Sequence, residues 1–186
     1  MALLSRKEKI ILCIGSCIVL GGLLTVLYSY LSPTGFAARK NSELGQASTH
    51  PEASYVTLDG ERVDMNDFES PLLIVNFWAS WSPFTHADGE VLKALKEEYG
   101  ERITIRAVNR KESVDTARAY LNTVGKAPGV EYILDTTDYL YAEGGGYAMP
   151  ETVVFDRTGN EVARIRGTLT LPDLRIRIEE LLGEGG

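Results

Sequence analysis

The sequence contains very little cysteine, and both thiols lie close to the N-terminus. Cys13 and Cys17 are the only cysteines among the 186 residues, so no thiol follows position 17. Disulfides, catalytic thiolates and cysteine metal sites all require sulfur. These three kinds of chemistry are therefore excluded for the long remainder of the chain.

Basic residues are also in short supply. The chain has 19 Lys and Arg against 26 Asp and Glu, with two histidines, and its formal net charge is −7. Proteins that bind nucleic acid need a basic surface to neutralise the phosphate backbone. The charge balance therefore argues against a nucleic-acid partner.

A long hydrophobic run occurs only near the N-terminus. Residues 10–31 contain no charged side chain, and at ~1.5 Å per residue they are long enough to cross a ~30 Å hydrocarbon core. Arg6, Lys7 and Lys9 precede the run, and basic residues favour the cytoplasmic side. We expect residues 1–9 to be cytoplasmic, residues 10–31 to form a single-pass transmembrane helix, and the rest to face the periplasm or the exterior.

Small side chains recur every four residues within this run. That spacing places them along one stripe of a helix, where a second membrane helix can approach closely. The stripe predicts helix association in the membrane, although small residues are common in membrane helices in any case. Its members are Cys13, Cys17, Gly21, Thr25 and Ser29.

The remainder divides into a polar linker at 32–54 and a structured domain at 55–186. The linker contains Pro33, Gly35 and Pro51 and shows no hydrophobic periodicity, which is typical of a tether. In the domain, a continuous apolar stretch at 72–77 predicts a strand buried on both faces.

The other predicted elements alternate between strand and helix before a hairpin and a last helix. Such an order predicts an α/β fold, with a mixed central sheet and helices on both faces. The expected elements are a short hairpin at 55–63, helices at 83–99, 113–124 and 171–182, and strands at 103–108, 152–155 and 161–165.

Three segments resemble membrane-tethered thioredoxin-like proteins of the TlpA/DsbE type. They are Val75-Asn-Phe-Trp-Ala-Ser-Trp81 with the following Ser82-Pro-Phe-Thr85, Met149-Pro-Glu-Thr152, and Arg166-Gly-Thr-Leu-Thr-Leu-Pro-Asp-Leu174. The second segment is similar to one found in the subgroup that serves cytochrome c maturation. The resemblance covers 55–182 and implies a thioredoxin-like fold.

The family's two motif cysteines are replaced in this chain. The resemblance implies a Cys-x-x-Cys pair at the start of the first helix, where Ser82 and Thr85 stand instead. Hydroxyls cannot exchange disulfides, so we expect no catalytic residues and interpret Ser82 as a helix N-cap. A hydrolytic pair of Ser82 with His86 is an alternative, but no orienting acid or oxyanion hole is evident.

The resemblance also implies a peptide-binding groove beside this motif. In the family a cis-proline loop faces the motif and pairs with an extended peptide as an added strand would; Pro150 occupies that place. For Asp88 the alternative is an exposed helix face, and for Glu151 a turn. The predicted groove residues are Trp81, Ser82, Phe84, Thr85, Asp88, Met149, Pro150 and Glu151.

No metal site or cofactor is predicted. His86, Asp88 and Glu151 are nitrogen and oxygen donors, but they are scattered along the sequence and make a weak ligand set.

Three functional hypotheses follow from these observations. The first is a redox-inactive module that binds an extended peptide or a partner subunit. The second is a thiol-disulfide oxidoreductase of the TlpA/DsbE family, which requires a partner to supply both thiols. The third is a structural subunit of a membrane complex assembled through its helix.

Overall fold

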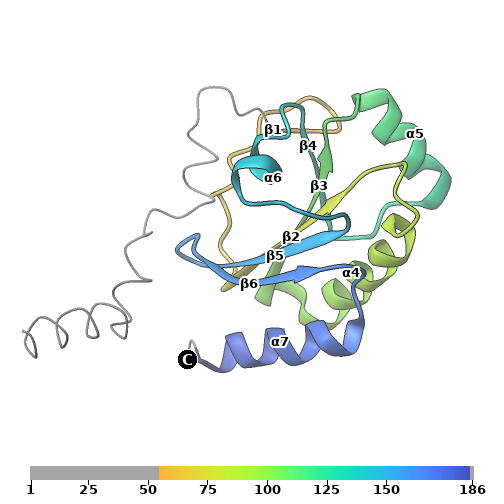
Figure 1. Cartoon of the computed structure of the whole chain (residues 1–186). Coiled ribbons are helices and arrows are strands. Elements are labelled where there is room, and N and C mark those ends of the chain that lie inside the picture. Colours follow the sequence, from red (N-terminus) through yellow and green to blue (C-terminus); the bar gives the residue numbers. More distant parts are fainter. Residues whose placement is uncertain (1–54, 185–186) are drawn as a thin grey trace, which may run out of the picture. The chain divides into compact units, whose positions relative to one another are not determined.

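The computed structural model describes residues 55–184, which form one α/β unit (Figure 1). Its elements in chain order are β1 (Tyr55–Thr57), β2 (Leu72–Trp78), α4 (Thr85–Tyr99), η1 (Gly100–Arg102), β3 (Ile103–Arg110), α5 (Val114–Val124), β4 (Glu131–Asp135), α6 (Tyr139–Glu143), β5 (Glu151–Asp156), β6 (Glu161–Arg166) and α7 (Leu171–Glu184). The predicted cytoplasmic segment 1–9, membrane span 10–31 with its stripe, and linker 32–54 lie outside the described residues. Within 55–184, no helix combines the length and the apolar character needed to cross a bilayer.

The six strands form a mixed sheet in the order β1-β4-β3-β2-β5-β6. β2, β3 and β4 run parallel, whereas β1, β5 and β6 pair antiparallel to their neighbours. The crossovers through α4 and α5 both move outward in the same direction, so right-handed connections place both helices on one face. This confirms the predicted α/β fold with a mixed sheet.

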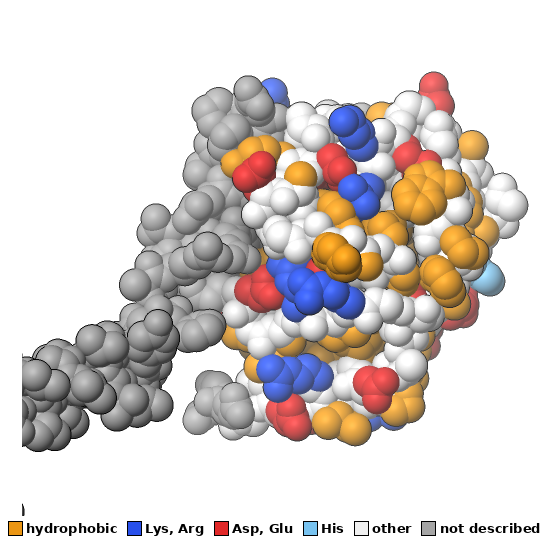
Figure 2. All heavy atoms as spheres, viewed as in Figure 1, with side chains coloured by type: hydrophobic (Ala, Val, Ile, Leu, Met, Phe, Trp, Pro, Cys, Tyr) orange, Lys and Arg blue, Asp and Glu red, His pale blue; other side chains and the backbone are white. Residues whose placement is uncertain are grey.

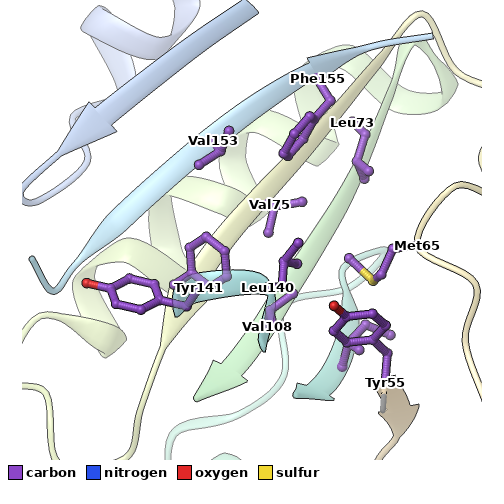
Figure 3. Packing of buried hydrophobic residues seen from close by; sticks show 11 residues of the cluster. Tyr55, Met65, Leu73, Val75, Val108, Leu140, Tyr141, Val153 and Phe155 are labelled. Carbon is purple, nitrogen blue, oxygen red and sulfur yellow. The ribbon is translucent and has the colours of Figure 1, made fainter. Parts of the chain in front are cut away.

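Helices cover both faces of the sheet, and β2 is buried throughout. On one face, Leu72 and Ile74 pack with residues of α4 and α7. On the other face, β2 contributes Leu73, Val75 and Phe77 to a cluster completed by α6 and by the segment between β1 and β2. Figure 3 shows this second cluster, in which Val75 lies between Leu140 of α6 and Val153 of β5. The alternation of side chains along β2 therefore fills two cores at once.

Most predicted elements are present, with small shifts at their ends. Ser113 caps α5 as predicted, accepting a hydrogen bond from the Thr116 amide at 3.1 Å. The hairpin near the domain start is present as β1 and an isolated bridge between Val56 and Arg62.

Two elements, β4 and α6, were not predicted from the sequence. β4 is only five residues long, and its burial rises from an exposed Glu131 to a buried end without a two-residue period. α6 is also five residues long, which is too short for a helical period to show. The predicted order was wrong in omitting them, and β4 is the strand that joins β1 to the sheet.

Candidate functional site

The candidate site lies at the carboxyl end of β2, where the direction of chain progression across the sheet reverses. The chain moves from β2 outward to β3 and β4, then returns to place β5 on the opposite side of β2. Such switch points leave a crevice at the ends of the strands, where α/β proteins bind ligands. The register pairs Phe77 with Glu151, so the loop before β5 lies beside the loop that leaves β2.

We call residues 79–85 the motif loop, and it is fixed from behind by Glu112. The carboxylate of Glu112 accepts hydrogen bonds from the Ser80 amide at 2.8 Å and from the Ser80 hydroxyl at 2.6 Å. It also accepts one from the Asn109 side chain at 2.7 Å. Glu112 therefore connects Ser80, which follows β2 and directly precedes Trp81, to Asn109 near the end of β3.

The two motif positions hold hydroxyl side chains in a closed turn. The Ser82 amide donates to the Ala79 carbonyl, and the Thr85 amide donates to the Ser82 carbonyl. The Thr85 hydroxyl donates to the Ala79 carbonyl at 2.8 Å. The Thr85 hydroxyl is thus engaged with the backbone, and Ser82 is buried.

The predicted N-cap role of Ser82 is wrong. α4 begins at Thr85 with Phe84 at the N-cap position, and no side chain caps it. Pro83 and Phe84 complete a turn before the helix starts, so Ser82 lies too far ahead to reach the first free amides of α4.

Aromatic side chains surround the motif loop and remain open to solvent. Trp81 is 65% exposed and Phe84 43%, while Tyr147, in the facing loop, is 85% exposed. Figure 2 shows hydrophobic side chains gathered at the surface over the region where β2 leads into α4. Large aromatic side chains are a costly feature to leave in water without a partner.

We call residues 147–151 the proline loop. Its Met149–Pro150 peptide bond is cis, as the resemblance implied. The Pro150 carbonyl accepts a hydrogen bond from the Gly167 amide at 2.9 Å. Pro150 is buried, whereas Met149 is half-buried and packs against the cluster of Figure 3.

Glu151 anchors the proline loop from inside the protein. It is the first residue of β5 and is fully buried, so its interpretation as a turn residue is wrong. Its carboxylate accepts a hydrogen bond from Arg164 at 2.8 Å and one from the Tyr147 amide at 3.1 Å. The Arg166 guanidinium lies 3.5 Å from the same carboxylate.

Arg164 links several groups around this loop. It also bonds Glu161 and the Gly144 carbonyl. The pKa of the Arg164 guanidinium is raised, chiefly by the hydrogen bond to Glu161 and also by Glu151.

Asp88 is buried as well, so its interpretation as part of an exposed helix face is wrong. It is 2% exposed and accepts a hydrogen bond from the Leu169 amide at 3.0 Å. Burial raises the pKa of this carboxyl, and hydrogen bonds from Leu169 and Asn76 oppose the rise. Asn76 also donates to the Thr152 hydroxyl at 3.0 Å. Asp88 therefore joins α4 to the segment before α7, beneath the surface of the groove.

The structure brings together most of the predicted groove residues but separates them by depth. Trp81, Phe84 and Met149 reach the surface or lie partly open, whereas Asp88 and Glu151 lie beneath it. His86 is exposed, and no hydrogen bond joins it to Ser82 among residues 55–184. In the same part of the chain, no three His, Cys, Asp or Glu side chains are grouped as metal ligands would be.

Three residues of the site were missed from the sequence: Glu112, Tyr147 and Arg164. Tyr147 carried a signal, because it follows three glycines directly ahead of the proline loop. Glu112 acts through a contact with Ser80, 32 residues away, and Arg164 acts across the β5–β6 hairpin. The hydrophobic pattern of the sequence reveals neither contact.

The mixed sheet and the cis-proline loop beside the end of β2 together define a thioredoxin-like protein. The model of the Redoxin family matches residues 45–176. The chain belongs to the Redoxin family.

Curated relatives match the chain over most of its length. The thiol:disulfide interchange protein HelX of Rhodobacter capsulatus is 29% identical, across 86% of this chain and 92% of the relative. The thioredoxin-like protein YneN of Bacillus subtilis is 23% identical, across 86% and 95%. The thiol:disulfide interchange protein DsbE of Vibrio cholerae is 30% identical across 54% and 52%.

Solved structures agree on the fold. A thioredoxin-like protein from Aeropyrum pernix superposes with a TM-score of 0.61 at 20% identity, covering 80% of this chain and 99% of that one. A secreted disulfide oxidoreductase of Mycobacterium tuberculosis, described as homologous to DsbE of E. coli, gives 0.58 at 15% identity, covering 69% and 94%.

Proposed function

We propose that this protein is a redox-inactive binding module that holds an extended peptide or a partner subunit in the groove between the motif loop and the proline loop. One observation supports the proposal: Ser82 and Thr85 stand where the resemblance implies thiols, while the aromatic side chains of Trp81 and Phe84 beside them are exposed. The groove comprises Trp81, Ser82, Phe84 and the loop around Pro150.

The chemistry of the motif loop supports the loss of redox function. Thiol-disulfide exchange requires a thiolate that attacks and a second thiol that resolves the mixed disulfide. A hydroxyl has a far higher pKa than a thiol and does neither. The Thr85 hydroxyl is in addition bonded to the Ala79 carbonyl, and no cysteine follows Cys17.

The surface of the groove suits a polypeptide ligand. Aromatic side chains provide large contact area at low entropic cost and dominate the energy of many interfaces. Trp81 and Phe84 come from one loop and Tyr147 from the facing loop, so a chain lying between the loops would contact all three. Main-chain pairing with the segment ahead of β5 would then add hydrogen bonds in the manner of an extra strand.

The two buried acids act as positioning residues in this proposal. Glu151 ties the proline loop to Arg164 and to the Tyr147 amide. Asp88 ties α4 to the segment before α7. Neither offers surface to a ligand, and both fix the elements that do.

We further propose that the domain is tethered to the cell membrane by residues 10–31 and faces the periplasm or the exterior. The uncharged run and the preceding basic residues support this topology. Association of that helix with another membrane helix, through the stripe of small residues, would assemble a complex around the module.

A second candidate is thiol-disulfide exchange carried out with a partner that supplies both thiols. The names of the relatives favour it, since HelX and DsbE are thiol:disulfide interchange proteins. In that case the groove would present a substrate to another protein's cysteines.

Site-specific crosslinking tests the binding proposal. A photoreactive amino acid is placed at Phe84 in the full chain, expressed in membranes, and irradiated. The matched control is Ile176, an exposed hydrophobic residue on α7 at 61% exposure. Crosslinks to polypeptide at Phe84 and none at Ile176 are the expected result. Equal crosslinking at both positions would contradict the groove.

An insulin-reduction assay separates the two candidates. The full chain with dithiothreitol should show no rate above buffer. A rate above buffer from the purified chain alone would overturn redox inactivity. A rate that appears only with a co-purified partner would favour the second candidate.

A further inference from the structure

A pocket of about 280 Å³ opens between α4 and α5, above the sheet. Asn76, Trp78 and Tyr132 of the strands lie at its base, and Leu92 of α4 and Leu121 of α5 line its sides. Trp81, Phe84 and Pro150 do not line it, whereas Thr85 does, so the pocket borders the motif loop at the start of α4. Pockets for small molecules typically measure ~300–1,000 Å³, and this one lies just below that range.

The pocket exists partly because α4 carries a glycine in its interior. Gly89 lines the pocket, and a Cβ built on it would meet no atom within 4 Å. Glycine within a helix costs ~0.5–1 kcal/mol relative to alanine. The helix therefore carries a destabilising residue at a position where a side chain would fit and would occupy the pocket.

Apolar and aromatic side chains line part of the pocket, beside the polar side chains of Asn76 and Thr85. The ring of Trp78 packs against Tyr120 at 5.8 Å between centroids and meets Tyr132 edge-on at 6.1 Å. The Trp78 indole N–H is already bonded to the Ala107 carbonyl. A flat apolar ligand would find its best contacts against such surfaces.

The rim of the pocket is charged. Lys93 and Lys126 line it, and within residues 55–184 neither ammonium group has a carboxylate within 4.0 Å. Glu90 lines the rim too, so the three charges sum to a single positive charge. In a chain of net charge −7, two unpaired lysines at one pocket favour an anion.

We propose that this pocket binds a small aromatic monocarboxylate, with its ring against the aromatic base and its carboxylate at Lys93 and Lys126. The pocket is too small for a dinucleotide, and one net positive charge at the rim matches one negative charge on the ligand. The charged groups that would hold the ligand, Lys93 and Lys126, are not among the groove residues, although Thr85 of the motif loop borders the pocket.

The two tryptophans of the chain allow a direct titration. In the full chain purified in detergent, Trp81→Phe leaves Trp78 as the single tryptophan reporter. Benzoate, phenylacetate and indole-3-acetate are titrated, each beside its neutral amide. We expect at least one acid to change Trp78 emission with saturation below ~1 mM, and its amide to bind about fivefold to tenfold more weakly.

Matched variants locate the binding. In the Trp81→Phe background, Gly89→Leu fills the pocket and should weaken binding at least about tenfold. Gly183→Leu is the control, because Gly183 is also a helical glycine with open space at its Cβ and lies on α7. Lys93→Met with Lys126→Met should remove the preference for acid over amide, and Lys111→Met should not.

Three results would overturn the proposal. They are the absence of saturation with all three acids, equal binding of acid and amide, and full affinity in a folded Gly89→Leu chain. Folding of each variant is checked by its thermal midpoint, so loss of binding through unfolding is recognised.

Discussion

The motif loop and the proline loop meet at the same end of the sheet, but carboxylates of different burial hold them. Glu112, behind the motif loop, is half-buried and bonds only neutral groups: an amide, a hydroxyl and a side-chain amide. Glu151, behind the proline loop, is fully buried and bonds Arg164. The carboxylate behind the motif loop thus has neutral donors, whereas the one behind the proline loop has a cationic donor as well.

Different residues occupy the motif positions and hold the two loops in place: Ser82 and Thr85 do the first, and Glu112 and Glu151 do the second. The motif loop holds Ser82 and Thr85 where the resemblance implies thiols, and Glu112 connects this loop to β3. The proline loop keeps its cis bond and its anchor. Both loops are thus anchored by buried or half-buried acids, which the proposed binding function requires.

The largest effect is expected from restoring the thiols. Ser82→Cys with Thr85→Cys places two cysteines one turn apart, where the Thr85 amide already bonds the Ser82 carbonyl. The double variant should form a reversible disulfide and raise insulin reduction from background to measurable turnover.

Peptide mapping by mass spectrometry identifies the new disulfide against Cys13 and Cys17. Ser82→Cys alone is the control, since it lacks the resolving thiol. A folded double variant that forms no 82–85 disulfide would show that the motif loop has lost the geometry as well as the sulfur.

Breaking the anchor of the proline loop should have the next largest effect. Arg164→Met leaves the Glu151 carboxylate buried with only the Tyr147 amide and the more distant Arg166. Removing one partner of a buried pair typically costs ~3–5 kcal/mol in the free energy of unfolding. We expect the low end of this range, because Arg166 compensates in part.

Urea unfolding of the full chain measures this loss. Arg175→Met is the control, because Arg175 pairs with Glu98 at the surface at 2.8 Å, and such pairs contribute ~0–1 kcal/mol. Equal losses in the two variants would mean that Glu151 is not held as an ion pair in the interior.

The sequence predicted most strands and helices but not the burial of Asp88 and Glu151. Strands such as β2, with a continuous apolar run, and helices with a clear period were predicted because their signal is local. Asp88 and Glu151 were assigned surface alternatives, since an acid in a helix or before a strand is usually exposed. Leu169, 81 residues from Asp88, and Arg164, on the strand that pairs with β5, supply the hydrogen bonds that make this burial tolerable. The spacing of apolar residues along one element does not reveal such contacts.

A smaller effect is expected at the motif loop. Glu112→Ala leaves the Ser80 amide without its acceptor, and an unsatisfied buried donor costs ~1–3 kcal/mol. Ser80 is only partly buried, so water will reduce the loss. Hydrogen exchange at the Ser80 amide should accelerate, while the Tyr147 amide stays protected.

Glu112→Gln is the matched variant, because its carbonyl oxygen can still accept from the Ser80 amide. It should keep most of the protection at Ser80. If Gln and Ala behave alike, the charge of Glu112 matters more than its hydrogen bonds, and the distinction between the two loops weakens.

The smallest effect concerns Asp88, a buried carboxyl that has no cationic hydrogen-bond partner within residues 55–184. Its pKa is raised from 3.8, chiefly by burial, so the folded state binds its proton more tightly than the unfolded state. The stabilising contribution is complete below pH 3.8 and is lost as the pH rises through the folded pKa. Asp88→Asn keeps the acceptor for the Leu169 amide and removes the proton.

The difference in unfolding free energy between wild type and Asp88→Asn, followed from acid to neutral pH, tests this. Wild type should lose stability relative to the variant as the pH rises, by at most about 1.4 kcal/mol per pH unit, since one proton is involved. If the two curves of unfolding free energy against pH run parallel, the hydrogen bonds from Asn76 and Leu169 fully offset the cost of burying the Asp88 carboxylate. Asp88 has amide donors, whereas Glu151 has Arg164. The pH dependence of the stability difference therefore shows whether a buried carboxylate in this site is stabilised by amide donors alone.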